Sequence, residues 1–191
     1  YGGYFILADN LNPYTQRVFN CLNEVDSIVI DPHKHGLQPY GCGCILYSDP
    51  SVGKFYKHDS PYTYFTSSDL HLGEISLECS RPGASAVALW ATQRLLPLNP
   101  GGEFAQGLTK ARKASLSLYE KIASDERFKT ILPPELDISV WAPNGSSASQ
   151  ISKRTEDIFH AVAKENIHFA TFKYPSSLLH DHWNDVTFDT Q

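Results

Sequence analysis

Asp31-Pro32-His33-Lys34-His35-Gly36 follows the aliphatic run Ile28-Val29-Ile30 directly, and this junction is the most informative part of the sequence. Three branched aliphatic residues in a row predict an extended, buried strand. Pro32 then ends the strand, because it has no N–H to donate to a neighbour. The sequence therefore places Lys34 at the end of a strand, where open α/β sheets bind ligands.

The two histidines beside Lys34 distinguish it from an ordinary surface lysine. His33 and His35 bring positive potential or hydrogen-bond donors close to its amine. Either effect favours the neutral form of an amine, and the neutral form attacks a carbonyl group. Lys34 is thus a candidate nucleophile.

Asp-Ser followed by aliphatic residues and Asp-Pro-His-Lys resembles the Schiff-base segment of the group II pyridoxal-phosphate (PLP)-dependent decarboxylases, which have fold type I. The resemblance implies that Lys34 holds the cofactor as an internal aldimine. It also implies that His33 contacts the cofactor phosphate or its support, and that Asp31 occupies a cofactor-binding position. The downstream segment from Pro39 to Tyr47 is similar to the family as well, because a Pro-Tyr pair and small residues lead into the next strand.

A second motif, Ser80-Arg81-Pro82-Gly83, precedes a predicted helix. The family has a Gly-Ser/Thr-Arg element here, which approaches the cofactor phosphate of the partner subunit. A hydroxyl, a guanidinium and the N–H groups of a helix start all suit a phosphate dianion. This sequence has Cys79 where the family usually has glycine. The alternative is that Ser80 caps the helix and Arg81 is solvated.

The aromatic segment from Lys54 to Ser68 has no regular period. In the decarboxylases a mobile loop in this region carries a tyrosine that reprotonates the carbon that has lost carbon dioxide. Tyr62 matches this position best, with Tyr64 second. The alternative is a cluster of aromatic residues that pack or form an interface.

The sequence also resembles only part of a decarboxylase. Tyr1-Gly2-Gly3 is similar to the residues that follow the family's His-Val-Asp-Ala-Ala segment, whose aspartate pairs with the pyridinium nitrogen. There is no methionine in the 191 residues. The expectation is a fragment that starts just past a catalytic residue.

Composition narrows the classes of partner. Hydrophobic residues make up 41% and charged residues 19% of the chain, which is typical of an ordered globular protein. The net charge of −5 argues against nucleic acid or an anionic membrane as a partner. The four cysteines have no zinc-site spacing, so we expect small buried thiols, no metal and a cytoplasmic location.

The hydrophobic pattern predicts several elements. Helices are expected over 14–22, 84–96, 103–124 and 147–165, and the helix 84–96 is apolar on nearly every side, which predicts burial. Strands are expected over 27–31, 43–48, 74–79, 138–141 and 168–174. Breakers lie at Pro97 to Gly102 and at Pro133-Pro134.

These elements favour an α/β protein, part of a fold type I PLP-dependent large domain plus a small C-terminal α/β domain. The expected division is 1–100 for the large-domain part, 101–132 for a connecting helix and 133–191 for an incomplete small domain. The implied function is a PLP-dependent amino-acid decarboxylase, a homodimer with shared active sites. Another fold type I reaction, such as transamination or an aldehyde-type lyase, stays open, as does a non-catalytic domain that pairs with another chain.

Overall fold

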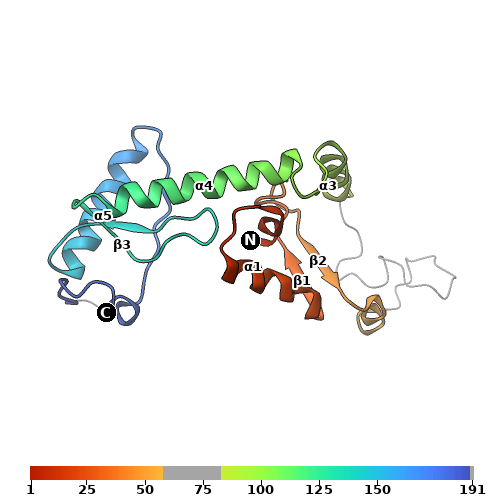
Figure 1. Cartoon of the computed structure of the whole chain (residues 1–191), viewed down its shortest axis with the longest axis horizontal. Coiled ribbons are helices and arrows are strands. Elements are labelled where there is room, and N and C mark those ends of the chain that lie inside the picture. The colour runs from red at the N-terminus through yellow and green to blue at the C-terminus, as the bar shows by residue number, and fades with distance from the viewer. Residues whose placement is uncertain (58–82, 190–191) are drawn as a thin grey trace. The chain divides into compact units, whose positions relative to one another are not determined.

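The computed structural model describes residues 1–57 and 83–189. The chain divides into two compact units, residues 1–109 and residues 110–191 (Figure 1). The division falls inside one long helix, α4 (Glu103–Ala123), so this helix contributes residues to both units. The expected domain limits at residues 100 and 132 stay a prediction.

The first unit consists of short elements around a two-stranded sheet. In chain order they are η1 (Gly3–Leu7), α1 (Pro13–Asn20), η2 (Cys21–Glu24), β1 (Ser27–Ile30), β2 (Cys44–Tyr47), η3 (Pro50–Phe55), α3 (Ala84–Leu95) and the start of α4. Helix α1 begins one residue before the predicted start at residue 14, because the Asn12 side chain accepts a hydrogen bond from the Thr15 N–H at 2.8 Å and Pro13 occupies the first turn. The predicted strand 74–79 lies outside the described residues.

Strands β1 and β2 pair antiparallel, with Ser27 opposite Tyr47 and Ile30 opposite Cys44. The prediction of two strands on either side of the lysine segment is therefore confirmed. The prediction that β1 is buried is wrong, because Val29 is 71% exposed. The two-stranded sheet has two faces, and in the part of the chain that the structure describes no layer covers the face that carries Val29.

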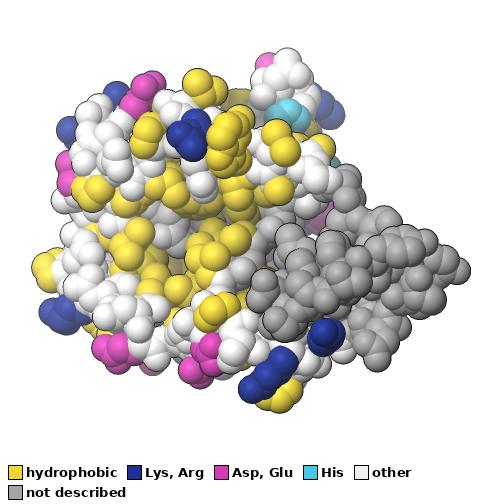
Figure 2. All heavy atoms as spheres, turned by 90° about the vertical axis from the view of Figure 1, so that its right-hand side faces the viewer, with side chains coloured by type: hydrophobic (Ala, Val, Ile, Leu, Met, Phe, Trp, Pro, Cys, Tyr) yellow, Lys and Arg dark blue, Asp and Glu magenta, His cyan; other side chains and the backbone are white. Residues whose placement is uncertain are grey.

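Helix α3 is present at the predicted place, but the predicted burial is wrong here too. None of its residues is buried, and Val87, Trp90 and Leu95 are 64%, 60% and 81% exposed. A helix that is apolar on every side needs neighbours on every side, and the described residues cover it only in part. Figure 2 shows the outcome as a broad area of hydrophobic side chains at the surface, with charged side chains mainly towards its edges.

The core of the first unit forms where η1 packs against α4. Phe5 is fully buried, and the Tyr4 ring meets the Phe104 ring edge-on, with 5.5 Å between the ring centroids. The Asp9 N–H donates a hydrogen bond to Thr109 Oγ1 at 3.2 Å. These contacts hold the N-terminal residues in a fixed position beside the start of α4.

The second unit has its own core. Its elements after α4 are β3 (Phe128–Thr130), β4 (Trp141–Pro143), α5 (Ala148–Ala163) and η4 (Ser176–Leu178). Ile151 of α5 packs with three residues from the C-terminal segment, Leu179, Trp183 and Val186. The Trp183 Nε1–H also donates to the Thr130 carbonyl at 3.0 Å, which ties this segment to β3.

Three sequence predictions for the second unit differ from the structure. The strand predicted at 138–141 lies instead at Trp141–Pro143, where it pairs antiparallel with β3. The hydrophobic pattern did not predict β3, because this strand is only three residues long. Residues 168–174 form no strand, because no described segment pairs with them. The predicted succession of strand 138–141, helix 147–165 and strand 168–174 is therefore wrong in its strands, and a single parallel bridge joins Ser147 and Thr187 instead.

No helix in the two described ranges combines the length and the apolar character that crossing a membrane requires.

Candidate active site

Lys34 lies in a compact loop that joins β1 to β2. The Lys34 N–H donates to the Asp31 carbonyl at 3.0 Å, and the Gln38 N–H donates to the Pro32 carbonyl at 3.0 Å. Pro32 is fully buried, and Leu37 adopts the left-handed conformation with φ of 58°. The loop is therefore a series of closed turns, and its backbone fixes where the Lys34 side chain starts.

The Lys34 amine is paired with a carboxylate of the same loop. Lys34 Nζ lies 2.5 Å from Asp31 Oδ2, and the side chains are 44% and 27% exposed, respectively. The hydrogen bond from Lys34 lowers the pKa of Asp31, and the positive charge of Lys34 and the nearby His33 act in the same direction. The amine is accessible to a ligand and is held in a defined place.

The ring of His33 is fixed by two contacts. Its Nδ1 lies 3.1 Å from the Cys42 carbonyl oxygen, and its ring stacks on Tyr40 with 5.4 Å between centroids. A carbonyl oxygen only accepts, so Nδ1 carries the hydrogen of this bond. Nε2 is then the ring nitrogen that can meet a ligand, and it donates a hydrogen bond only when the ring is protonated.

His35 has a different role from the one the sequence suggested. Its Nδ1 lies 3.3 Å from the Tyr1 carbonyl oxygen, and its ring packs against Tyr1 and Phe5 at centroid distances of 5.1 and 4.9 Å. These contacts turn the ring towards the N-terminal segment. His35 therefore anchors the loop, and His33 is the histidine placed to serve the site.

Gln38 fastens the loop to α3, a role that the sequence did not reveal. Its side chain is buried, and Nε2 donates to Thr92 Oγ1 at 2.8 Å and to the Gly36 carbonyl at 3.2 Å. A buried amide of this kind stabilises a loop because breaking its hydrogen bonds would leave polar groups without partners. A polar residue two positions after Gly36 was the only available signal in the sequence.

Gly36 is required at its position because the backbone of the loop passes close to it. A Cβ atom there would lie 2.6 Å from Pro32 Cα and 2.7 Å from both the Pro32 carbonyl oxygen and the Tyr4 hydroxyl. These distances are shorter than van der Waals contact, and two of the three atoms belong to the backbone. The lysine loop can therefore close only around a residue without a side chain.

We expect Gly36→Ala to lower the free energy of unfolding by about 1–3 kcal/mol, the usual cost of forcing an extra methyl group into a packed site. Gly43→Ala is the matched control, since a Cβ atom at Gly43 would meet no atom within 4 Å. Urea unfolding of the two variants and the wild type measures the difference. Equal stability of both variants would contradict the tight closure of the loop.

The three described cysteines are free thiols that differ in exposure. Cys42 is buried, with its Sγ 3.8 Å from the Ser85 carbonyl oxygen, whereas Cys44 is partly buried and Cys21 is exposed. Burial raises the pKa of Cys44. Burial also raises the pKa of Tyr4, and the nearby thiols of Cys44 and Cys42 raise it further. Within residues 1–57 and 83–189 no group of three or more His, Cys, Asp or Glu side chains converges as a metal site would require.

The structure thus brings three of the predicted site residues together in one loop: Asp31, His33 and Lys34. The other four predicted residues, Tyr62, Tyr64, Ser80 and Arg81, lie outside the described residues.

Comparison with solved structures establishes the class of fold. The chain is similar to Oryza sativa TDC with PLP and tryptamine, with a TM-score of 0.73 and 14% identity over 91% of this chain and 36% of that one. It is also similar to Catharanthus roseus tryptophan decarboxylase in complex with L-tryptophan, with a TM-score of 0.67 and 17% identity over 92% of this chain and 36% of that one. The chain has the α/β fold of the fold type I PLP-dependent decarboxylases, as predicted.

Sequence comparison makes the resemblance more specific. The chain is 39% identical over 87 residues to L-tyrosine decarboxylase from Enterococcus faecium, which is 44% of this chain and 14% of that protein. It is 27% identical over 168 residues to the probable L-tyrosine/L-aspartate decarboxylase of Methanococcus aeolicus, which is 86% of this chain and 40% of that protein. No family model matches the chain. The predicted resemblance to the C-terminal part of the group II decarboxylases is confirmed.

Proposed function

We propose that the chain is part of a PLP-dependent amino-acid decarboxylase, a carboxy-lyase. The observation that carries the proposal is the Lys34 amine, which an ordered loop presents at the end of β1, accessible and paired with Asp31. A single loop thus supplies a primary amine for an aldehyde, an imidazole for a phosphate and a carboxylate that holds the amine. Sequence similarity to tyrosine and tyrosine/aspartate decarboxylases supports the choice of reaction.

The residues of the loop fit pyridoxal phosphate by the chemistry of their donor groups. Lys34 would hold the cofactor covalently through Nζ, the one kind of side-chain amine that forms a Schiff base. His33 would meet the phosphate or its support through Nε2, because Nδ1 is engaged by Cys42. When bound, the cofactor supplies an electron sink for the electrons left by the lost carboxylate.

The residues of this chain would have separate tasks in the reaction. Lys34 would release the cofactor to the amino group of the substrate and recapture it afterwards. Tyr62 would deliver a proton to the α-carbon of the substrate, with Tyr64 as the second candidate. His33 would keep the phosphate end in place while the other end changes partners.

We also propose that the protein is a homodimer with shared active sites. Ser80 and Arg81 would contact the cofactor phosphate of the partner subunit, since a hydroxyl and a guanidinium together suit a phosphate dianion. We further propose a cytoplasmic location, with which the free thiol groups of Cys21, Cys42 and Cys44 are compatible.

Product analysis tests the proposed reaction. We expect the full-length protein with PLP to release carbon dioxide and the corresponding amine from a member of a panel of aromatic and acidic amino acids that includes tyrosine and aspartate. The panel follows the names of the relatives. Transfer of the amino group to a keto acid without release of carbon dioxide would overturn the decarboxylase proposal in favour of an aminotransferase.

A further inference from the structure

We propose that the C-terminal unit binds a free α-amino acid in a cleft between the turn at Glu126-Arg127 and helix α5, with the carboxylate of the ligand on Arg154 and its ammonium group on Glu126. All the residues that line this cleft belong to the unit 110–191, whereas the lysine loop belongs to the unit 1–109. Neither the cofactor nor any residue of the lysine loop takes part in this binding.

The cleft has the size of a small-molecule site. Its volume is about 630 Å³, within the range of roughly 300–1,000 Å³ that is typical of ligand pockets. Asn144, directly after β4, fixes one wall, because its N–H donates to the Arg127 carbonyl at 2.7 Å and its Nδ2 donates to the Glu126 carbonyl at 2.9 Å. Gly145 then brings the chain close to α5, since a Cβ atom there would lie 2.9 Å from Ile151 Cγ1. The walls are therefore held in place without a ligand.

Arg154 of α5 supplies a guanidinium that is already ordered. Its Nη1 donates a hydrogen bond to the Asn144 carbonyl. A guanidinium has several N–H donors, so one bond leaves others for a ligand. An arginine held in this way loses little further side-chain freedom when its planar fork binds a carboxylate. The Ser149 N–H in the first turn of α5 already donates to Asp189 at 2.9 Å, so the carboxylate site is the Arg154 side chain and not the helix N-terminus.

The other charged groups at the cleft cancel in pairs. Arg127 Nη2 lies 2.6 Å from Asp125 Oδ2, and Lys129 Nζ lies 2.7 Å from Asp185 Oδ2. Hydrogen bonds from these two partners lower the pKa of both carboxyl groups, and that of Asp125 falls to about 2. Both carboxylates are therefore ionised at neutral pH and offset the charge of their partners.

One positive and one negative side chain remain, and they define the ligand. In the part of the chain that the structure describes, neither Arg154 nor Glu126 forms an ion pair. Asn144 contacts both residues, since its carbonyl accepts from Arg154 and its amide donates to the Glu126 backbone. A carboxylate alone would be repelled by Glu126, and an amine alone would be repelled by Arg154. An α-amino acid carries both charges on one carbon and so complements both side chains.

Equilibrium dialysis of the cofactor-free, full-length protein with labelled L-tyrosine, and separately with labelled L-alanine, tests this site with a large and a small side chain. Without the cofactor no Schiff base can hold the amino acid, so Lys34→Ala should bind both probes as the wild type does. Two analogues of tyrosine serve as competitors. N-acetyl-L-tyrosine lacks the ammonium group and tyramine lacks the carboxylate, so each should compete only at clearly higher concentrations than L-tyrosine.

We expect Arg154→Gln to bind the amino acid about tenfold more weakly, because a charged hydrogen bond is lost. Glu126→Gln should weaken binding by about two- to fivefold, the usual effect of an exposed charge. The same change should not weaken the binding of N-acetyl-L-tyrosine, since the charge that it removes repels this anion. Lys153→Gln is the matched control, because it removes a positive charge from the adjacent position of α5 and does not line the cleft.

The outcomes separate this site from the proposed function. Equal binding by the wild type and Arg154→Gln, or no binding of either probe, would overturn the site. Equal affinity for L-tyrosine and N-acetyl-L-tyrosine would overturn the amino-acid assignment in favour of a general carboxylate site. If Arg154→Gln does not fold, Glu126→Gln and the two analogues decide the question. A protein that takes up no PLP would overturn the proposed function and leave these measurements intact, whereas a loss of binding confined to Lys34→Ala would overturn the site in the C-terminal unit.

Discussion

Lys34→Ala is expected to lower the rate of carbon dioxide release by roughly 10²–10⁴-fold or more, the range that follows loss of a positioned catalytic group. The reason is that the variant has no amine at the end of β1 to hold the cofactor. Lys34→Arg is expected to be as inactive, although it can keep an ion pair with Asp31, because a guanidinium stays protonated and cannot attack a carbonyl. Carbon dioxide release from the best amino acid of the panel measures both.

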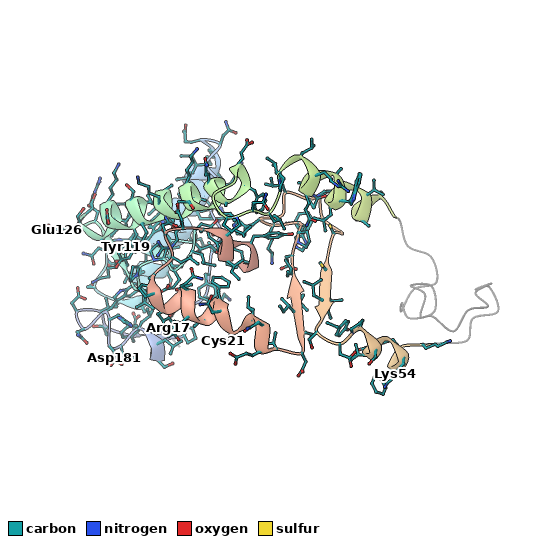
Figure 3. All side chains as sticks on the ribbon, turned by 45° about the vertical axis from the view of Figure 1, so that its right-hand side comes forward. Arg17, Cys21, Lys54, Tyr119, Glu126 and Asp181 are labelled. Atoms are coloured by element: carbon teal, nitrogen blue, oxygen red, sulfur yellow. The ribbon has the colours of Figure 1, made fainter. Side chains whose placement is uncertain are left out.

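Lys54→Ala is the control for this experiment. Lys54 belongs to η3, the short helix after β2 (Figure 3). Its Nζ lies 5.0 Å from the centroid of the Phe55 ring. It is a second lysine of the same unit with a different partner, so we expect its removal to leave the reaction rate close to that of the wild type. Loss of activity in Lys54→Ala, or retention of activity in Lys34→Ala, would contradict the assignment of the reactive lysine.

Tyr62→Phe is expected to reduce amine production by about 10²–10⁴-fold, if Tyr62 is the general acid that returns a proton to the α-carbon. The substitution keeps the ring and removes only the hydroxyl. Binding of the cofactor should survive, because Lys34 and His33 are unchanged, and an aldehyde should appear as a side product. Chromatography of the products from the wild type and the variant measures this change.

Two other tyrosines serve as comparisons for Tyr62→Phe. Tyr40→Phe keeps the ring that stacks on His33 and is expected to leave the ratio of products unchanged. Tyr64→Phe tests the second candidate for the proton donor. Unchanged amine production by Tyr62→Phe, together with a loss in Tyr64→Phe, would move the role to Tyr64.

The two strands β1 and β2 and the lysine loop between them could be predicted from the sequence because their signals are local. Branched aliphatic residues mark β1, Pro32 marks its end, and the helix starts at Asn12 and Ser147 carry capping side chains. Helices α3, α4 and α5 also lie close to their predicted ranges, because long periodic patterns are strong signals.

Burial could not be predicted in the same way, because it depends on which elements pack together. The apolar pattern of α3 and β1 gave the correct secondary structure but the wrong exposure, as Trp90 and Val29 show. A similar reason applies to residues 168–174, since a strand needs a partner that its own sequence does not specify. The pattern of a segment describes the segment, whereas pairing and burial are properties of two or more segments.

The same distinction between local signals and contacts with distant residues applies to the candidate site. Asp31, His33 and Lys34 could be named from the sequence because they are contiguous. The anchoring role of His35 and the hydrogen bonds of Gln38 to Thr92 could not, since both depend on contacts with residues far away in the chain. The tight closure around Gly36 became visible only from the distances to Pro32 and Tyr4.

Borohydride reduction of the full-length protein with bound PLP, followed by peptide mapping, tests the central claim most directly. Reduction makes the bond between the cofactor and the amine that holds it permanent, so the modified peptide identifies the lysine. The account predicts that the modified peptide contains Lys34 within the segment Asp31 to Gly36, and that no such peptide forms in Lys34→Ala. A cofactor fixed to any other lysine, or a full-length protein that takes up no PLP, would contradict it.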